Sequence, residues 1–383
     1  MNNEEFEAGL RGRLYLLVGA LMPLSFSLAS VARPLLAVAV GVQAGILAII
    51  PLVSNIAQIF FRPIFGYLSD KHGRKIFISI AVLIYATGYI IYSIAESPLH
   101  IIIASFVIGI GIGCLWPALM ALSAEIGSNA RESLGSLLML SFLGSLIGSV
   151  FSGFVAEVFG WRETYMLSAL VALCAFLVAV MLKEPSMKRE APDIRSSLKL
   201  SYKIAARSVT RINSIGLKPI LSTYLPVILL DLGLTQTIIG VFMAFDRLIT
   251  SIMQKVSAKV STKKLFRIPA INLLSLGALL LFITMASYHN LLLAISSYIT
   301  YSVGAGLLPT SELAEATERA GRAKGSGAGG FGVALSFTRI IASSIATAGG
   351  SIEIASLSPV ISALLASTLA FMFLSIIGVI KGS

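Results

Sequence analysis

Long apolar stretches separated by short polar ones run through the whole chain. The apolar stretches fall near residues 14 to 38, 44 to 66, 76 to 95, 98 to 122, 133 to 156 and 163 to 182, and again near 212 to 231, 236 to 255, 268 to 287, 291 to 310, 329 to 351 and 357 to 380. Each is close to the roughly 20 residues that an α-helix needs to cross the hydrocarbon core of a bilayer. The pattern predicts an all-α integral membrane protein with 12 transmembrane helices.

A polar and basic stretch separates the first six spans from the last six. We therefore expect an N-terminal six-helix bundle over residues 1–182, a cytoplasmic linker over residues 183–211 and a C-terminal six-helix bundle over residues 212–383. In the linker, basic residues recur every four positions with apolar residues between them, which predicts a basic amphipathic helix on the lipid surface. These basic residues are Lys199, Lys203, Arg207 and Arg211.

The two halves share a local pattern, because a proline precedes a Gly-Val or Gly-Leu pair by the same seven residues within Arg33–Gly45 and within Leu225–Gly240. Each half then continues into another apolar span. This repeat predicts that the two six-helix bundles are pseudo-symmetric.

Composition and charge support a membrane location. Hydrophobic residues make up 56% of the chain and charged residues 12%, and the mean hydropathy is +0.91, values far from those of soluble proteins. With both termini cytoplasmic, only Arg162 among the 29 Lys and Arg residues falls in an outer loop. The basic residues thus follow the positive-inside rule, so the net charge of +11 indicates topology and not nucleic-acid binding. We expect a multi-pass protein of the cytoplasmic membrane.

The polar segment GYLSDKHGRK, Gly66–Lys75, lies between the second and third spans. Its glycines predict a tight hairpin, and its cations predict that this hairpin is cytoplasmic. The segment resembles the signature loop between helices 2 and 3 of the major facilitator superfamily, which reads roughly G-x-L-a-D-r-x-G-R-[RK]. The matching residues are Gly66, Leu68, Asp70, Gly73, Arg74 and Lys75.

This resemblance implies a transporter with two six-helix halves that hold a solute near the membrane midplane and expose it to each side in turn. It also implies a conformational lock on the cytoplasmic side. Asp70 would face the start of helix 11, near residues 327–331, and Arg74 would pair with Glu125 near the end of helix 4. The alternative is that these charges serve topology alone. The full predicted lock comprises Gly66, Asp70, Gly73, Arg74, Lys75 and Glu125.

Ionisable residues inside membrane spans are costly, so each is a functional hypothesis. Arg62 lies one helical turn before Gly66, and we interpret it as structural, with its charge reaching the cytoplasmic interface. The residues in the spans are Arg33, Arg62, Lys218, Asp246, Arg247 and Arg339.

Arg33 and Lys218 stand directly before prolines in spans 1 and 7, which line the central cavity in the family that this chain resembles. Cations facing one cavity favour an anionic solute, because guanidinium and ammonium groups bind carboxylates and phosphates. We therefore predict that Arg33, Lys218 and Arg339 bind the substrate. The alternative is that Arg33 and Lys218 each reach water on their own side.

Asp246 is the acid placed deepest in the membrane, and Arg247 and Arg339 are the cations that we expect beside it. An Asp246–Arg339 pair at the interface between the halves would open and close with transport, which makes Asp246 the candidate proton site. The alternative is a permanent ion pair that fixes helix packing.

Two departures from related sequences limit the prediction of proton antiport. Span 4 has Ser105 where proton-coupled relatives often carry an arginine. Span 5 reads GSLIGSVFSG, which keeps its glycines but has Ser149 and Ser152 in place of a proline and a glycine that antiporters often show. Close helix packing through small residues explains the span 5 stretch.

The favoured function is secondary active transport of a small organic solute, which we expect to be an anion, by alternating access and with proton coupling through Asp246. A multidrug exporter that works by proton antiport is the alternative, and a transport-dead membrane sensor is a more remote one. We do not expect an enzyme, a cofactor or a metal site, because the three histidines lie in separate loops. The expected partners are the solute, protons and the lipid bilayer, and the expected state is a monomer.

Overall fold

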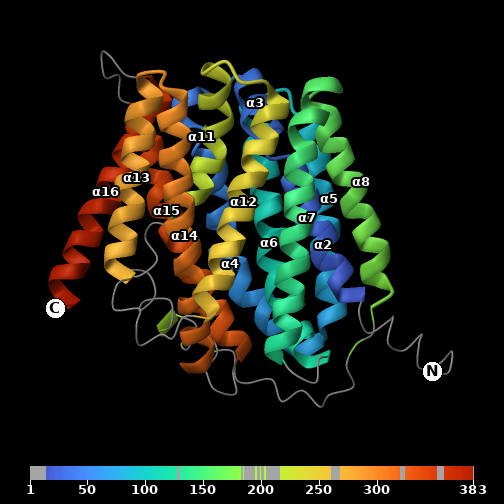
Figure 1. Cartoon of the computed structure of the whole chain (residues 1–383). Coiled ribbons are helices and arrows are strands. Elements are labelled where there is room, and N and C mark those ends of the chain that lie inside the picture. The colour runs from blue at the N-terminus through green and yellow to red at the C-terminus, as the bar shows by residue number, and fades with distance from the viewer. Residues whose placement is uncertain are drawn as a thin grey trace.

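The computed structural model of this chain is a bundle of long helices that run side by side (Figure 1). The residues that it describes are 14–126, 130–182, 184, 195, 199, 202–203, 216–259, 268–319, 324–351 and 358–382.

The helices of the first half follow the predicted spans closely. The first span is broken into two helices, and a short 3-10 turn leads into the second span. The elements are α2 (Leu14–Leu28), α3 (Ala32–Ala39), η1 (Ala44–Ile46), α4 (Ile49–His72), α5 (Arg74–Ser93), α6 (Pro98–Ile126), α7 (Ala130–Val158) and α8 (Trp161–Val180).

The second half also has one helix for each predicted span. Together with the first half, and with α2 and α3 counted as one span, this agrees with the predicted 12 transmembrane helices. The elements are α11 (Lys218–Asp231), α12 (Gln236–Lys259), α13 (Ile268–Ser287), α14 (Leu291–Arg319), α15 (Lys324–Gly350) and α16 (Pro359–Gly382).

The polar segment between the second and third spans differs from the predicted hairpin. Helix α4 continues through Gly66 and Asp70 to His72, and the turn is confined to Gly73, whose φ of +110° favours glycine. A helix satisfies its own backbone hydrogen bonds, so it need not end where the apolar residues end. Because Asp70 lies inside α4, it does not begin the next helix.

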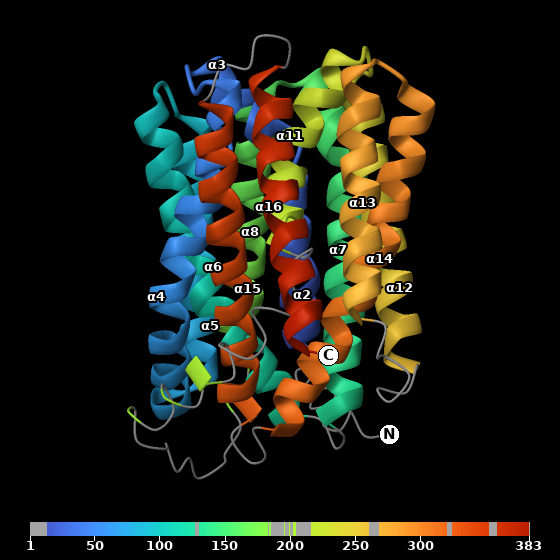
Figure 2. The same ribbon diagram turned by 90° about the vertical axis from the view of Figure 1, so that its left-hand side faces the viewer.

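The helices group into two halves, α2 to α8 and α11 to α16. In Figure 1, α5 to α8 lie on the right, α13 to α16 on the left, and α4 and α12 overlap in the middle. Across the boundary, α4 packs against α15 and α7 packs against α12. Helix α2 begins and α16 ends at the same end of the bundle (Figure 2). We call this end, where α4 also ends, the motif end, and the opposite one the far end. The predicted linker helix lies mostly outside the described residues, so the predicted domain limits stay predictions.

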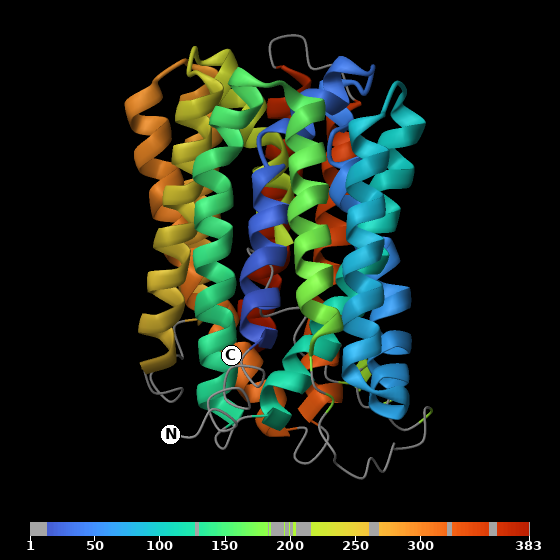
Figure 3. The ribbon, with the colours of Figure 1, turned by 90° about the vertical axis from the view of Figure 1, so that its right-hand side faces the viewer.

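Small residues bring α7 into close contact with its neighbours. A Cβ atom added at Gly144 would overlap the backbone of Ala20 in α2, and one added at Gly153 would overlap the backbone of Gln236 in α12. Figure 3 shows α2 between α7 and α8, which both pack against it. This geometry agrees with the interpretation of the span 5 glycines as packing residues.

The break in the first span is stabilised by a serine of α7. Ser152 Oγ accepts a hydrogen bond of 2.9 Å from the backbone N–H of Val31 and lies 3.3 Å from Ser30 Oγ. A backbone group freed inside a membrane needs such a partner. The break places Arg33 at the start of α3, close to the centre of the bundle.

Candidate functional site

A cavity of about 580 Å³ lies between the two halves. Helices α2 to α7, α11, α12, α14 and α15 contribute to its wall. The charged side chains that line it are Arg33, Lys218, Asp246, Arg247 and Arg339. The fold thus brings together all the charges predicted in the spans except Arg62, from parts of the chain that are far apart in sequence.

Asp246 pairs with Lys218 inside this cavity. Lys218 Nζ lies 3.5 Å from Asp246 Oδ1, and it also donates to Thr250 Oγ1 one turn further along α12. Ser302 Oγ of α14 donates a 2.5 Å hydrogen bond to the same Asp246 oxygen. The expected Asp246–Arg339 pair does not form, because Lys218 at the start of α11 reaches the carboxylate from the neighbouring helix.

Arg247 bridges the two halves of the molecule. Its Nη1 donates to Ser27 Oγ of α2, and to Ser145 Oγ and the Ser145 carbonyl of α7 at 2.5 and 3.1 Å. Adjacent residues of a helix point about 100° apart, so Arg247 and Asp246 face different partners. The hydroxyls of the first half therefore solvate a cation of the second half.

Arg33 folds back over the break that precedes it. Its Nη2 donates to the Phe26 carbonyl at 3.2 Å, and its guanidinium carbon lies 4.2 Å from the centroid of the Phe26 ring. Tyr92 and Tyr165 stack near it with ring centroids 4.5 Å apart. The surroundings of Arg33 thus provide acceptors and aromatic faces for its charge.

Arg62 is buried, in contrast to the interpretation that it reaches the interface. Its side chain is 8% exposed, and its Nη2 donates to Gln58 Oε1 at 2.9 Å. Glycines on both sides make room for it, since Gly113 of α6 approaches its backbone and Gly332 of α15 lies against its guanidinium. In the sequence, this burial is indicated by the glycines of spans 4 and 11, which leave space for a long side chain.

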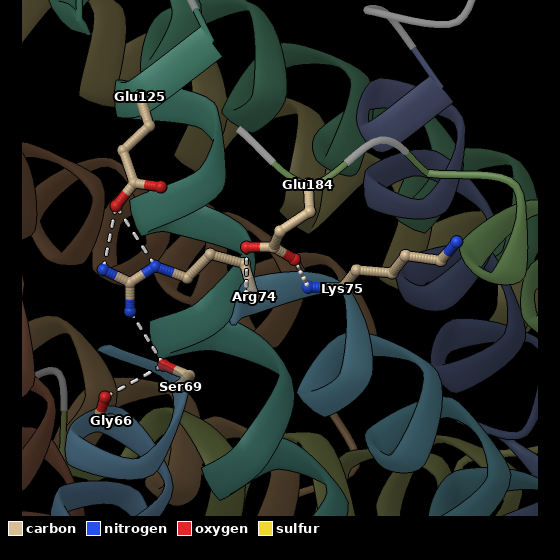
Figure 4. Close-up of polar contacts among 6 residues, drawn as sticks. All are labelled: Gly66, Ser69, Arg74, Lys75, Glu125 and Glu184. Atoms are coloured by element: carbon tan, nitrogen blue, oxygen red, sulfur yellow. Dashed lines mark hydrogen bonds and ion pairs between the residues drawn. The ribbon is translucent and has the colours of Figure 1, made fainter. Parts of the chain in front are cut away.

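At the motif end, Arg74 and Glu125 form the predicted pair (Figure 4). Arg74 Nη2 and Nε lie 2.9 and 3.2 Å from Glu125 Oε1, and Nη1 donates to Ser69 Oγ at 2.8 Å. Ser69 in turn donates to the Gly66 carbonyl at 2.9 Å. Gly66 and Ser69 belong to α4, Arg74 to α5 and Glu125 to α6. These contacts therefore join three helices of the first half.

Glu184 is a residue of this cluster that sequence reasoning missed. Its two carboxylate oxygens accept 2.8 Å hydrogen bonds from the backbone N–H groups of Arg74 and Lys75 (Figure 4). These are the first N–H groups of α5, where a negative charge is favourable. Lys75 directs its ammonium group away from Glu184 (Figure 4). The sequence gives one indication of this contact, because Glu184 is an acidic residue directly after the sixth span.

The predicted contact of Asp70 with residues 327–331 cannot be followed in the structure, because the Asp70 side chain lies outside the described residues. The backbone places Asp70 near the end of α4 and those residues in the first turns of α15. The two helices pack against each other.

The halves touch at the far end of the bundle. Tyr224 of α11 donates from its hydroxyl to the Gly45 carbonyl at 2.5 Å, and its oxygen lies 3.3 Å from the Ala48 nitrogen. A second contact joins Trp161 Nε1 of α8 to Gln236 Oε1 of α12 at 3.1 Å. Gly45 also meets the backbone of Gly350 in α15. The far end is therefore closed by direct contacts between the halves.

Within the part of the chain that is described, no three His, Cys, Asp or Glu side chains gather in a way that could hold a metal ion.

Long apolar helices packed in two halves around a central cavity with charged residues in its wall indicate a multi-pass membrane transporter. The family model of the Major Facilitator Superfamily matches residues 15–343, and the chain belongs to this family. The fold agrees with solved transporters of low sequence identity. The nucleoside transporter NupG, as its D323A mutant, aligns with a TM-score of 0.72 and 13% identity over 95% of this chain and 98% of its own.

Two further solved structures share the fold. A D-xylose–proton symporter aligns with a TM-score of 0.69 and 15% identity over 94% of this chain and 96% of its own. A bacterial homologue of the human lysosomal transporter Spinster, in an inward-facing and occupied conformation, aligns with a TM-score of 0.72 and 14% identity over 97% of this chain and 95% of its own.

A shorter sequence match involves the quinolone resistance protein NorB of Staphylococcus aureus. It is 31% identical over 115 residues, which is 30% of this chain and 25% of NorB. The match thus spans about a quarter of that relative's length.

Proposed function

We propose that this transporter moves a small organic anion across the cytoplasmic membrane by secondary active transport with alternating access. The observation that carries the proposal is the charge of the cavity. Its lining holds four cations and one carboxylate, Asp246, among the described residues. An excess of positive charge in a low-dielectric cavity attracts an anion and opposes a cation.

The proposed substrate-binding residues are Arg33, Lys218 and Arg339. They approach the cavity from α3, α11 and α15, so a solute between them contacts both halves. A volume of about 580 Å³ lies within the roughly 300 to 1,000 Å³ of small-molecule sites. A solute held by both halves is a suitable cargo for alternating access, since its contacts change when the halves move.

Asp246 is the proposed proton site. An anion that draws Lys218 toward itself takes the cation away from Asp246. A buried carboxylate without its partner becomes neutral by binding a proton. The Lys218–Asp246 pair at 3.5 Å thus offers a link between solute binding and proton uptake.

The proposed orientation has the motif end and both termini in the cytoplasm, with the protein acting as a monomer in the bacterial-type inner membrane. The positive-inside rule supports this orientation, because the basic residues gather in the loops of the motif end. In the described state the far end is closed, and the Arg74–Glu125 contact at the motif end stays within the first half. The proposed lock between the halves therefore depends on Asp70 and α15.

A second candidate function is multidrug export by proton antiport. The resemblance to NorB over part of the chain supports it, as do the aromatic residues Phe26, Trp116 and Phe142 in the cavity wall. A cationic drug would pair with Asp246, which is already engaged by Lys218.

Flux through vesicles that contain the purified protein tests the proposal. Vesicles with an inward proton gradient, which drives symport, and vesicles with an outward one, which drives antiport, are offered radiolabelled organic carboxylates, phosphate esters and lipophilic cationic drugs. Accumulation of carboxylates or phosphate esters, inhibited by other anions, supports anion transport. Transport of cationic drugs alone replaces it with the exporter function, and the absence of flux for every class contradicts both.

A further inference from the structure

Arg62 of α4 and Arg339 of α15 are two cations on helices that pack against each other across the boundary between the halves. Arg62 lies on α4 beside Gly332 of α15, and the charge of Arg339 acts on it. Helices α4 and α15 run in opposite directions, so Arg339, seven residues after Gly332, lies about 10 Å further toward the far end, level with Asn55. Arg339 therefore lies about two helical turns nearer the far end than Arg62, on the helix that packs against α4.

The described residues provide no acid for this pair. Neither Arg62 nor Arg339 takes part in an ion pair within the described ranges, and the Nε atom of each is buried without a hydrogen-bond partner. Arg62 has a single side-chain acceptor, Gln58 Oε1. Two like charges buried together are unfavourable unless an anion lies between them. The missing counter-charge indicates a ligand.

The other cations of the cavity already have acceptors within the protein. Lys218 contacts Asp246, Arg33 donates to the Phe26 carbonyl, and Arg247 donates to Ser27 and Ser145. Arg339 also lines the cavity, and no hydrogen bond of its side chain is present among the described contacts. Among the described residues, Arg339 is therefore the cavity cation whose guanidinium has no acceptor within the protein.

The wall next to the pair has the polarity that an amphipathic anion needs. Asn55 and Gln58 line the cavity on the same face of α4 as Arg62. Arg62 donates to the side-chain oxygen of Gln58, so the amide nitrogen of Gln58 points toward Ser54, another lining residue. This nitrogen lies 3.3 Å from the Ser54 carbonyl oxygen and 3.4 Å from Ser54 Oγ. Ile112 and Trp116, on either side of Gly113, supply an apolar surface.

We propose that Arg339, supported by Arg62 and Gln58, forms the subsite for the carboxylate or phosphate group of an amphipathic organic anion whose apolar part lies against Trp116. This inference rests on the proposed anion transport and specifies where the anionic group binds. Arg339 contacts the anion, and Arg62 acts as a positioning residue that orients Gln58 and adds positive charge. An oxyanion accepts two parallel hydrogen bonds from a guanidinium group, which fits Arg339.

Binding is measured with the purified full chain by the fluorescence of Trp116. The chain has 2 tryptophans, so a Trp161→Phe background leaves Trp116 as the reporter. Because this background lacks the Trp161–Gln236 contact, thermal stabilisation by the same anions is first compared between it and the unaltered chain. The probes are phenylacetate, phenyl phosphate, inorganic phosphate and the neutral phenylacetamide. We expect the anions to bind and the amide not to bind, and Arg339→Gln to weaken anion binding roughly tenfold or more, since charge-assisted hydrogen bonds are lost.

Two comparisons separate a binding role from a structural one. Arg62→Gln should weaken anion binding while leaving the ligand-free melting temperature unchanged or raised, because it removes like-charge repulsion. Arg62→Lys should restore part of the affinity. Arg162→Gln is the matched control, since Arg162 is an exposed arginine that donates to the Ala95 carbonyl at 3.0 Å, and it should bind anions normally.

The failures of the two proposals are distinguishable. If the anions bind and Arg339→Gln retains full affinity while Arg33→Gln loses it, the subsite is at Arg33 and this inference is overturned, but anion transport stands. A lower ligand-free melting temperature in Arg62→Gln and Arg339→Gln, with normal anion affinity, also overturns it. If no anion binds the wild-type protein, both proposals fail.

Discussion

Lys218 of α11 and Asp246 of α12 form an ion pair in the central cavity, with Nζ and Oδ1 3.5 Å apart. The two helices are consecutive, so the pair lies within the second half and does not itself join the halves. Its cation faces the cavity, where, under the proposed function, an anionic solute would compete with Asp246 for it. The pair would then couple the charge of the cargo to the charge of one carboxylate.

Removing one member of this pair should cost more stability than removing both. Lys218→Met leaves Asp246 without its cation, and loss of one partner of a buried pair costs about 3 to 5 kcal/mol, with the lower end expected because Lys218 is 25% exposed. The double variant Lys218→Met with Asp246→Leu should recover much of this loss. Thermal unfolding in detergent measures both. Equal loss in single and double variants would show that the two residues act independently.

Asp246→Asn should separate proton coupling from solute exchange. The amide is close in size to the carboxylate and still accepts the hydrogen bond from Ser302, but it cannot exchange a proton. We expect accumulation driven by a proton gradient to be abolished, while exchange of labelled for unlabelled solute across the vesicle membrane continues. Vesicle flux under both conditions provides the measurement. Full proton-driven accumulation in the variant would exclude Asp246 as the proton site.

Glu184→Ala should destabilise the start of α5. The change leaves the N–H groups of Arg74 and Lys75 without their acceptors, and loss of a helix cap costs about 0.5 to 2 kcal/mol. Hydrogen exchange at these amides should increase. Glu96→Ala is a suitable control, because Glu96 is an exposed acid of the opposite end. Unchanged exchange in Glu184→Ala would mean that water replaces the carboxylate without loss.

Gly73→Ala should be unfavourable for a different reason. Gly73 has φ +110° and ψ 148°, a conformation that costs a side chain about 1 to 3 kcal/mol, and its Cβ would lie 3.2 Å from the Glu184 carboxylate. Gly277→Ala in α13 is the matched control, since a Cβ there meets nothing within 4 Å and alanine favours helix. The melting temperature should fall for Gly73→Ala and stay the same or rise for Gly277→Ala.

The helices and the Arg74–Glu125 pair were accessible from sequence for a physical reason. A membrane span requires about 20 apolar residues, and this requirement is visible along the chain without knowledge of tertiary contacts. The family motif then related Arg74 to Glu125, and in the structure Arg74 Nη2 lies 2.9 Å from Glu125 Oε1. Hydropathy was thus sufficient to locate the helices, and the family motif was sufficient to predict the Arg74–Glu125 contact.

The partners of the buried charges were not accessible in the same way. Asp246 pairs with Lys218 instead of Arg339, because the choice depends on how α11 starts beside α12. Arg62 is buried because Gly113 and Gly332 of two other helices leave space for it. The partners of these charges depend on which helices are neighbours and on how each helix is rotated about its axis. Hydropathy gives neither the neighbours nor the rotation.

The close approach of Gly45 to Gly350 makes the far end a place where one side chain can shift the conformational equilibrium. A Cβ at Gly45 would overlap the Gly350 carbonyl and also lie 2.7 Å from Pro359 Cβ, so Gly45→Val cannot be accommodated while the far end is closed. Interiors of proteins are too closely packed to absorb such an overlap. We expect the variant to favour a state with the far end open and to transport slowly.

Spin labels at Gln43→Cys and Ser351→Cys, both exposed positions next to this contact, report the separation of the halves at the far end. The exposed native thiol is removed by Cys174→Ser, whereas Cys114 is buried. Double electron–electron resonance should show a longer distance in Gly45→Val than in the parent. Gly277→Val, at a glycine of α13 whose added Cβ would meet nothing within 4 Å, should leave this distance unchanged. An unaltered distance in Gly45→Val, together with normal flux, would mean that the Gly45–Gly350 contact does not control closure of the far end.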